Sequence, residues 1–393
     1  MTSSPIIEPV AITGMSLCNA LGGSTDEVRE ALARSETKLR PPSIELPFQT
    51  AAGAIDIELP SLDGNLRPWS THLTRIAAHL LRNIEGELAT LRQRWRQDRI
   101  AVILGTSTAG AETTEAAFRQ YLATDRLPED YDLWCQHTYG AVLHVMRALT
   151  GAQGPAWVVS TACTSSAKPL ASAQRLIHAG LADAAIVGGI DTLCEMTLRG
   201  FHALGALSSK PCRPFAAARD GISIGEGGAL LLLERSGDPM VWLEAVGESS
   251  DAYHISAPHP QGLGAQLAMQ RAIERAGCSP SAVHHVNAHG TGTRLNDSAE
   301  AQAISQLFGD EVPVVSTKGY TGHTLGAAGA TEAVLASFAL THGWIPASLG
   351  AAPMDEKISV NVSTERTTGT FHRALSNSFA FGGNNVSVLL RAA

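Results

Sequence analysis

One cysteine and two histidines stand in turns of small residues that each follow an apolar run. They are Cys163 in STACTSSA (160–167), His289 in VNAHGTGT (286–293) and His323 in STKGYTGHTLGAAGA (316–330). A thiolate is a nucleophile, and an imidazole can move a proton or donate an N–H group to a developing negative charge. If the fold brings these turns together, they supply a nucleophile and two imidazoles at one site.

The turn around Cys163 lies between an expected buried strand at 157–159 and a helical pattern at 170–179 that ends at Gly180. Free backbone N–H groups and the macrodipole at a helix N-terminus favour a thiolate. The sequence therefore predicts that Cys163 sits at a helix N-terminus and that its thiol pKa is lowered. A buried structural cysteine is the competing interpretation of this segment, and for the segment alone it is the commoner case.

The turn around His289 can approach a ligand closely. Gly290 and Gly292 carry no side chain, while Thr291 and Thr293 offer hydroxyl groups for an amide-bearing substrate arm. The alternative is a loop histidine whose hydrogen bonds are satisfied within the protein.

The turn around His323 is flanked by an ionisable pair, Lys318 and Glu332. If buried, this pair could orient the histidines. The alternative is an exposed ion pair that contributes under ~1 kcal/mol. A fourth segment, NSFAFGGNN (377–385), is a glycine turn before the last expected strand, and its plain interpretation is a hairpin-like connection.

The elements that must position these turns alternate between apolar runs and helical segments, which predicts a layered α/β protein with largely buried sheets. A strand at 7–13 ends at Gly14, and a helix follows Ser24, with Glu27 placed as in a capping box. We expect irregular surface structure at 40–70 and one helix at 71–94. The other expected strands are 100–105, 157–159, 184–189, 229–234, 285–288, 312–316 and 386–390.

A turn-rich segment at 234–239 (ERSGDP) divides the chain before a new strand at Val241. We expect an N-terminal half, 1–238, that carries Cys163 and a C-terminal half, 239–393, that carries both histidines. No repeat between the halves is visible in the sequence.

The composition of the 393 residues excludes several classes of function. Net charge is −8 and no Lys/Arg-rich run occurs, so nothing indicates nucleic-acid binding. No apolar stretch reaches the length of a membrane span. The six cysteines form no C-x-x-C pair and no zinc-type cluster, so we expect a cytoplasmic enzyme with no bound metal.

Together, the four segments resemble the β-ketoacyl-acyl carrier protein synthases, or ketosynthases. Further motifs of that family are ITGM (12–15), RPF (213–215), RDG (219–221) and GEG (225–227), so the resemblance runs through most of the chain. It implies a thiolase-like fold of five layers, α-β-α-β-α, built from two similar halves. It also implies a decarboxylative condensation of an acyl thioester with malonyl-acyl carrier protein.

The resemblance assigns a role to each site residue. Cys163 takes the acyl group from a phosphopantetheine thioester, and the backbone N–H groups of Cys163 and Phe381 hold the oxyanion. His289 and His323 stabilise the malonyl enolate as CO2 leaves. Lys318 and Glu332 support the histidines, Thr291 and Thr293 bind the pantetheine arm, and Thr108, Phe201 and Gly382 belong to the substrate site. No cofactor is expected on the enzyme itself, because phosphopantetheine belongs to the acyl carrier protein.

The sequence also departs from the family pattern. Ala380 and Asn384 replace the first glycine and the threonine of the usual GFGGTN ending, Thr108 stands at the chain-length position, and Ala216 replaces an aspartate. We interpret these changes as signs of a specialised synthase for a fatty acid, polyene or polyketide chain.

Three other functions compete with this interpretation. A chain-length factor shares the fold but normally lacks the nucleophile, which this chain has as Cys163. A thiolase generally uses a second cysteine near the C-terminus, and no cysteine follows Cys278. A Cys-His hydrolase explains neither the second histidine nor Lys318.

The expected partners are an acyl carrier protein and a second subunit. The second subunit makes the enzyme a homodimer or a heterodimer with a chain-length-factor-like chain. The carrier protein is acidic, and Arg67 and Arg75 are weak candidates for contacting it. A solvated surface charge is the commoner interpretation of each.

Overall fold

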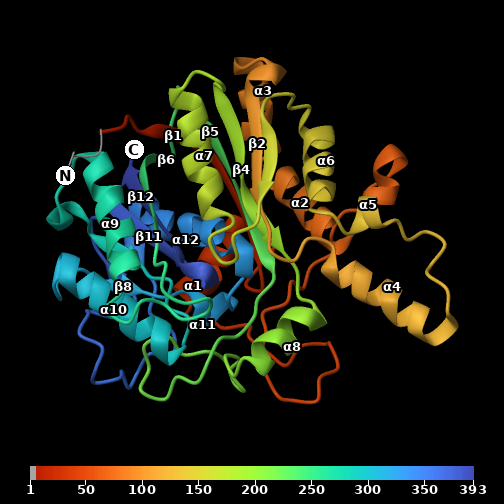
Figure 1. The fold of residues 1–393 in the computed structure, drawn as a ribbon. Coiled ribbons are helices and arrows are strands. Elements are labelled where there is room, and N and C mark those ends of the chain that lie inside the picture. The colour runs from red at the N-terminus through yellow and green to blue at the C-terminus, as the bar shows by residue number, and fades with distance from the viewer. Residues whose placement is uncertain (1–5) are drawn as a thin grey trace.

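The computed structural model describes residues 6–393, and ten of its strands form one mixed sheet (Figure 1). The strand order is β3-β2-β4-β5-β1-β6-β12-β11-β7-β8. The first five are β1 (Val10–Asn19), β2 (Ile100–Gly105), β3 (Ala156–Val159), β4 (Ala184–Asp191) and β5 (Gly227–Glu234). The second five are β6 (Val241–Ser250), β7 (His285–Asn287), β8 (Val314–Val315), β11 (Arg373–Phe379) and β12 (Asn384–Ala392). A separate small sheet pairs β9 (Trp344–Ile345) with β10 (Thr367–Thr368).

The sheet consists of two halves with the same topology. Read from its edge, the first half runs 3-2-4-5-1, and the second, read from the opposite edge, runs 8-7-11-12-6. Parallel and antiparallel pairs fall at the same places in both halves. The halves join where β1 pairs with β6 through only three residue pairs. The repeat is therefore one of topology, although it cannot be seen in the sequence.

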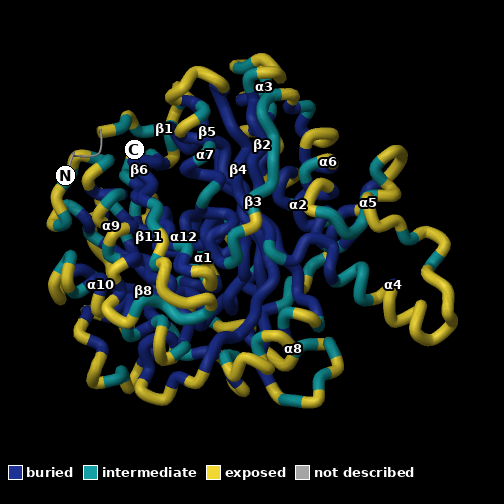
Figure 2. The backbone as a smooth tube through the Cα atoms, in the orientation of Figure 1, coloured by how far each residue is buried: buried dark blue, intermediate teal, exposed yellow. Residues whose placement is uncertain are grey.

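Helices α7 (Ala167–His178) and α12 (Ala328–His342) form the middle layer, because each contacts strands of both halves. Every residue from Ala328 to Ala339 of α12 is buried. Small residues allow this close packing: a Cβ atom on Gly329 would lie 2.6 Å from the Cβ of Ala167 on the neighbouring helix. Figure 2 shows the sheet and these helices as the buried centre of the molecule.

The outer faces of the two half-sheets carry their own helices. Helices α2 (His72–Asn83) and α6 (Tyr139–Thr150) cover the first half, and α9 (Leu263–Ala276) covers the second and packs against α10 (Arg294–Phe308). The layers thus alternate α-β-α-β-α, and the expected thiolase-like fold is confirmed. No helix among residues 6–393 combines the length and the apolar character needed to cross a bilayer.

The remaining helices connect these layers, and two of them project from the body on the right of Figure 1. The projecting pair is α4 (Ala111–Thr124) and α5 (Leu133–Gln136). The others are α1 (Thr25–Ala33), α3 (Glu85–Arg94), α8 (Glu195–Ala203), α11 (Lys318–Thr321), and the 3-10 turns η1 (Gly64–Trp69), η2 (Gln97–Arg99), η3 (Pro280–Ala282), η4 (Leu325–Ala327) and η5 (Phe381–Gly383).

Several predicted elements differ from the observed ones. Strand β1 does not end at Gly14, because a bulge between Ile12 and Gly14 lets the ladder with β5 continue to Asn19. The helix expected at 71–94 is two helices, α2 and α3, which meet at Ile84. Strand β11 was not predicted, and β3 is a half-exposed edge strand rather than a fully buried one.

The predicted cap of the first helix is half correct. The Ser24 hydroxyl accepts a hydrogen bond from the backbone N–H of Glu27, as expected. The Glu27 carboxylate, however, accepts from the backbone N–H of Gly23 instead of Ser24.

Candidate active site

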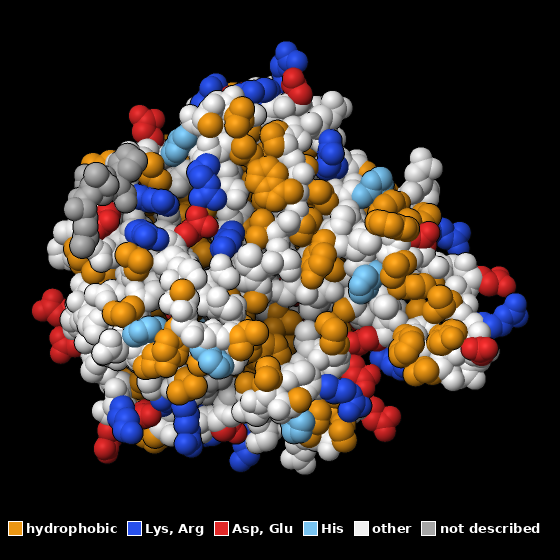
Figure 3. Space-filling model, viewed as in Figure 1, with side chains coloured by type: hydrophobic (Ala, Val, Ile, Leu, Met, Phe, Trp, Pro, Cys, Tyr) orange, Lys and Arg blue, Asp and Glu red, His pale blue; other side chains and the backbone are white. Residues whose placement is uncertain are grey.

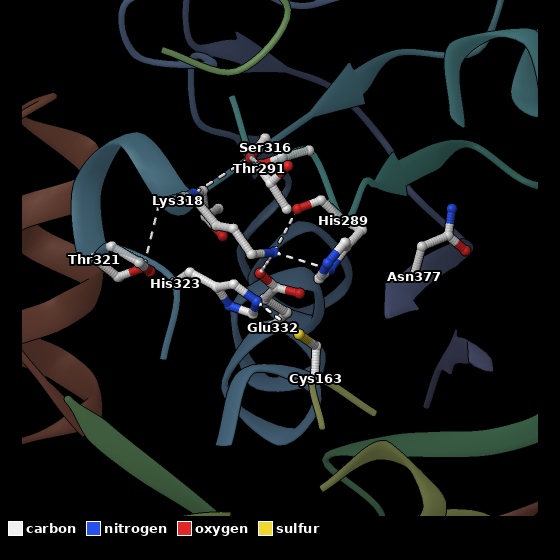
Figure 4. Close-up of polar contacts among 12 residues, drawn as sticks. Cys163, His289, Thr291, Ser316, Lys318, Thr321, His323, Glu332 and Asn377 are labelled. Carbon is white, nitrogen blue, oxygen red and sulfur yellow. Dashed lines mark hydrogen bonds and ion pairs between the residues drawn. The ribbon is translucent and has the colours of Figure 1, made fainter. Parts of the chain in front are cut away.

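Cys163 and His323 follow corresponding strands of the two halves and meet at the centre of the molecule. Cys163 comes after β3 and His323 after β8, and His323 Nε2 lies 3.0 Å from Cys163 Sγ. The turn before the cysteine is unusual, because Ala162 adopts a φ of 52°, in the left-handed region that disfavours side chains. Figure 4 shows that the Cys163 sulfur points toward His323, and the side chain of Cys163 is buried.

His289 completes the cluster from the end of β7. Its ring centroid lies 5.2 Å from that of His323, and the two rings are nearly perpendicular, at 83°. Cys163, His289 and His323 are all buried and line one cavity of about 490 Å³. The structure therefore brings together the three residues that the sequence singled out.

The predicted environment of the cysteine is wrong in one respect. Helix α7 begins at Ala167, so Cys163 lies in the preceding turn rather than at the helix N-terminus. Burial raises the pKa of the Cys163 thiol to about 12, although the charge of Lys318 and the backbone N–H groups of Cys163 and Phe381 oppose this rise. The resting group is thus a thiol, and its proton needs an acceptor.

Both histidines are suited to act as neutral groups. Burial, together with the charge of Lys318, holds the pKa of His289 and of His323 well below its usual value. Each imidazole therefore has one nitrogen that accepts and one that donates. In the structure, Nε2 of His323 faces the sulfur and is positioned to accept the thiol proton.

Lys318 determines which nitrogen of His289 carries the proton. Its Nζ lies 3.3 Å from Nδ1 of His289, donates to the backbone carbonyl of that residue and pairs with the Glu332 carboxylate (Figure 4). An ammonium group can only donate, so Nδ1 must accept and Nε2 carries the hydrogen. Lys318 is 1% and Glu332 3% exposed, which excludes the exposed-pair interpretation.

His323 is held differently, because no side chain orients its second nitrogen. Nδ1 of His323 has no hydrogen-bond partner within residues 6–393. Lys318 therefore sets the tautomer of His289, whereas the ring of His323 can carry its proton on either nitrogen.

Two acidic residues of α10, which the motif analysis missed, hold the turn that carries His289. Glu300 accepts from the backbone N–H groups of His289 and Gly290 at 2.8 and 2.7 Å, and burial raises the pKa of its carboxyl to about 7. Asp297 accepts from Thr291 at 2.9 Å. The signal was present in the sequence, since two acids three residues apart lie on one helix face.

Most of the expected substrate-side residues line the same cavity. Thr291 and Thr293 do so, with their hydroxyl oxygens 2.9 Å apart. Phe201 and Phe381 also line it, and their ring centroids lie 5.7 Å apart.

Thr108 and Gly382 are not among the residues that line the cavity. The buried Thr108 hydroxyl donates to the Asp191 carboxylate at 2.7 Å, and Gly382 is an exposed turn residue with a φ of 82°. Whether either one contacts an acyl chain stays a prediction.

Residues 380–384, hereafter the gate turn, carry two of the departures from the family pattern. The Oδ1 atom of Asn384 accepts a hydrogen bond of 2.9 Å from Lys168, which lies in the first turn of α7. Phe381 lies in the gate turn, and its backbone N–H faces the sulfur of Cys163. The substitution at Asn384 thus links the helix after the cysteine to the turn that covers it.

The chemistry of the cluster suits acyl transfer, and its geometry would also suit a metal ion. One ligand atom from each of Cys163, His289 and His323 lies within 4.8 Å of the others. The expectation that no metal takes part stays a prediction.

Comparison with known proteins places the whole chain. Residues 72–238 match the N-terminal domain of β-ketoacyl synthases, and residues 241–352 match their C-terminal domain. The 3-oxoacyl-[acyl-carrier-protein] synthase 2 of Mycobacterium tuberculosis is 31% identical over 411 aligned positions, which cover 96% of each chain. That of Staphylococcus aureus is 34% identical over 75% of this chain and 77% of its own.

A solved structure covers the full length. It is a ketosynthase (ApeO) in complex with its chain length factor (ApeC) from Xenorhabdus doucetiae, with 38% identity, a TM-score of 0.93 and complete coverage of both chains. The matches extend over both halves and include every turn of the cluster. The chain that places Cys163 beside two neutral histidines therefore belongs to the β-ketoacyl synthase family of acyltransferases.

Proposed function

We propose that this chain condenses an acyl thioester with malonyl-acyl carrier protein, with loss of CO2, by way of an acyl group on Cys163. One observation carries the proposal: the Cys163 sulfur lies 3.0 Å from Nε2 of His323, and His289 shares the same buried cavity. Family membership supports it, because the relatives are named as 3-oxoacyl-acyl carrier protein synthases.

The first half-reaction transfers the acyl group. The Cys163 sulfur attacks the thioester carbon while its proton passes to Nε2 of His323, and the N–H groups of Cys163 and Phe381 hold the oxyanion. When the intermediate collapses, the carbon–sulfur bond to pantetheine breaks. The departing sulfur takes the proton from His323, so the products are acyl-Cys163 and a free pantetheine thiol.

The second half-reaction forms the carbon–carbon bond. The malonyl thioester oxygen accepts a hydrogen bond from Nε2–H of His289, which Lys318 keeps in that tautomer. His323 adds a second bond, because its unpartnered Nδ1 allows the proton to move to Nε2. As CO2 leaves, the enolate carbon attacks the carbonyl carbon of acyl-Cys163 and the carbon–sulfur bond of the acyl-enzyme breaks. The released Cys163 thiolate takes up one proton from water, which regenerates the thiol.

The proposed partners are an acyl carrier protein and a second ketosynthase-like subunit. The structural relative from Xenorhabdus doucetiae was solved with its chain length factor. Here β3 is an edge strand packed against α6, and α5 packs against α6 in turn. Helices α4 and α5 project with apolar side chains exposed, a cluster visible at the right of Figure 3. These side chains are Phe118, Leu122, Leu127, Leu133 and Trp134. A related subunit would cover them and extend the sheet, giving a heterodimer or a homodimer.

Three further points belong to the proposal. We place the reaction in the cytoplasm, supported by six free cysteines. We place the boundary between the halves at 238/239, supported by the segment between β5 and β6. The Lys168–Asn384 hydrogen bond supports a role in a specialised pathway rather than in primary fatty acid synthesis. The bond depends on Asn384, which stands where the family pattern has a threonine.

The test is intact-protein mass spectrometry after incubation with a library of acyl carrier proteins. The wild-type protein and Cys135→Ala, the matched control at a half-exposed cysteine, should each gain one acyl mass, whereas Cys163→Ala should gain none. Full condensation by Cys163→Ala would refute the proposal. Condensation with an acetyl donor and without release of CO2 would indicate a thiolase instead.

A further inference from the structure

The segment from His289 to Arg294 runs from the floor of the active-site cavity to its rim. His289 and Thr291 are buried, Thr293 is half-buried and Arg294 is exposed, and all four line the same cavity. The segment is held in place, because Asp297 and Glu300 accept hydrogen bonds from its backbone N–H groups. Its side chains therefore form a graded path with the Cys163 thiol at the inner end.

Arg294 is the one cationic side chain among the described residues that line this cavity. Its guanidinium group forms no ion pair within residues 6–393, whereas the neighbouring Arg219 is buried and paired with Asp297 and Asp355. Two carboxylates, Asp220 and Asp251, line the same cavity, but neither forms an ion pair with Arg294 among the described residues; they accept hydrogen bonds from Ser208 and Asn385. A solvated surface charge is the ordinary state of an exposed arginine, but this one stands at the entrance of a cavity.

The proposed substrate has a charge where this arginine lies. A phosphopantetheine arm carries its thioester at one end, two amides along its length and a phosphodiester at the other. If the thioester lies at Cys163 and the amides lie beside the hydroxyl groups of Thr291 and Thr293, the phosphodiester end of the arm points outward, toward the rim where Arg294 lies. A guanidinium group binds phosphate oxygens through paired, charge-assisted hydrogen bonds.

We infer that Arg294 is a binding residue for the phosphodiester of the phosphopantetheine arm, an inference that rests on the proposed function. The site takes an anionic group at the rim and so selects an arm with a phosphate over a pantetheine chain without one. Arg294 lies at the rim of the cavity, whereas Cys163 lies at its inner end. Arg294 therefore acts in binding the arm and not in the chemical steps.

The experiment compares two ligands that differ only in the phosphate. Dissociation constants of 4′-phosphopantetheine and of pantetheine are measured by saturation-transfer NMR, which requires no turnover. Wild-type protein should bind 4′-phosphopantetheine about tenfold more tightly, and added salt should reduce the difference. Arg294→Ala should bind both ligands equally, and Arg294→Lys should keep part of the preference. Lys210→Ala, an exposed cation that does not line the cavity, is the matched control and should behave as wild type.

Four results would overturn the inference. They are a phosphate preference that survives in Arg294→Ala, an equal loss of affinity for both ligands, a wild-type protein with no preference, and no binding of either ligand. Failure of the proposed function is separable, since it would appear as no acylation of Cys163 by any carrier protein while the phosphate preference remained.

Discussion

Nζ of Lys318 lies 3.3 Å from Nδ1 of His289, and both groups are buried. The same ammonium group pairs with Glu332. One cation thus holds His289, the proposed hydrogen-bond donor to the enolate, and neutralises a buried carboxylate, so its effects on stability and on rate can be separated.

Lys318→Met should destabilise the protein by about 3–5 kcal/mol, because it leaves the Glu332 carboxylate unpaired in the interior. The double variant Lys318→Met/Glu332→Leu should recover most of that free energy of unfolding, measured by chemical denaturation. The rate of malonyl decarboxylation should be at least about tenfold lower than in the wild type in both variants, because neither variant fixes the tautomer of His289. A double variant as active as wild type would show that the pair does not position His289.

Activity should rise as pH increases through about 7, because the ionised Glu300 carboxylate holds the backbone of His289 and Gly290 more strongly than the acid does. In Glu300→Gln the rate should be lower, by about tenfold at pH 8, and this rise should be smaller but still present, because burial also raises the pKa of the Glu332 carboxyl to about 7. A rise of unchanged size in Glu300→Gln would assign it to another group.

Stability should show the opposite trend. Burial raises the pKa of Glu300 from 4.5 to about 7, so the folded protein binds the proton more tightly than the unfolded chain. The contribution of this group is full below pH 4.5 and is lost as pH rises to about 7, by up to about 3 kcal/mol. Denaturation curves at pH 5 and pH 8 should therefore differ less for Glu300→Gln than for wild type.

Breaking the bond between Lys168 and Asn384 should slow acylation of Cys163. Without it the gate turn is held less firmly, and the Phe381 N–H group is less well placed for the oxyanion. Lys168→Met and Asn384→Thr should each lower the single-turnover acylation rate about tenfold, and together they should do little more. Lys168→Arg keeps a donor and serves as the control. Additive losses would mean that the two residues act separately.

Trp134→Glu should weaken subunit association. The Trp134 side chain is 75% exposed on α5, in the apolar cluster proposed to face the second subunit. A carboxylate buried there without a partner should raise the dissociation constant at least about tenfold, as measured by sedimentation or light scattering. Met240→Glu, at an exposed apolar residue between the two halves, should associate as wild type does. Equal effects of both changes would point to a different interface.

The local patterns of the sequence predicted much of the fold. The apolar run at 100–105 coincides with β2, and the break at 234–239 begins at the last residue of β5 and ends before β6. Where prediction failed, long-range pairing decided the outcome. Gly14 does not end β1, because the strand pairs with β5 on both sides of the bulge. Strand β11 contains three polar residues in a row, 376–378, which do not read as a buried strand, yet it is buried between β12 and β7.

The three cluster residues were identified by type and spacing, but their protonation could not be. A helix start near Cys163 suggested a lowered thiol pKa, whereas burial by both halves raises it. Likewise, the Lys168–Asn384 bond joins residues 216 positions apart, and no local pattern predicts such a contact.

Cys163 and His323 occupy matching positions, each between the third strand of its half and the buried helix that follows, α7 or α12. The repeated topology places the proposed nucleophile and its proposed proton acceptor at equivalent points of the two halves, although α11 lies between β8 and His323 and the described residues 160–162, between β3 and Cys163, form no helix. Two halves of the same strand topology thus contribute different side chains, a thiol and an imidazole, to one site. Each half supplies one member of the pair, so under the proposed mechanism neither half by itself forms the acyl-enzyme.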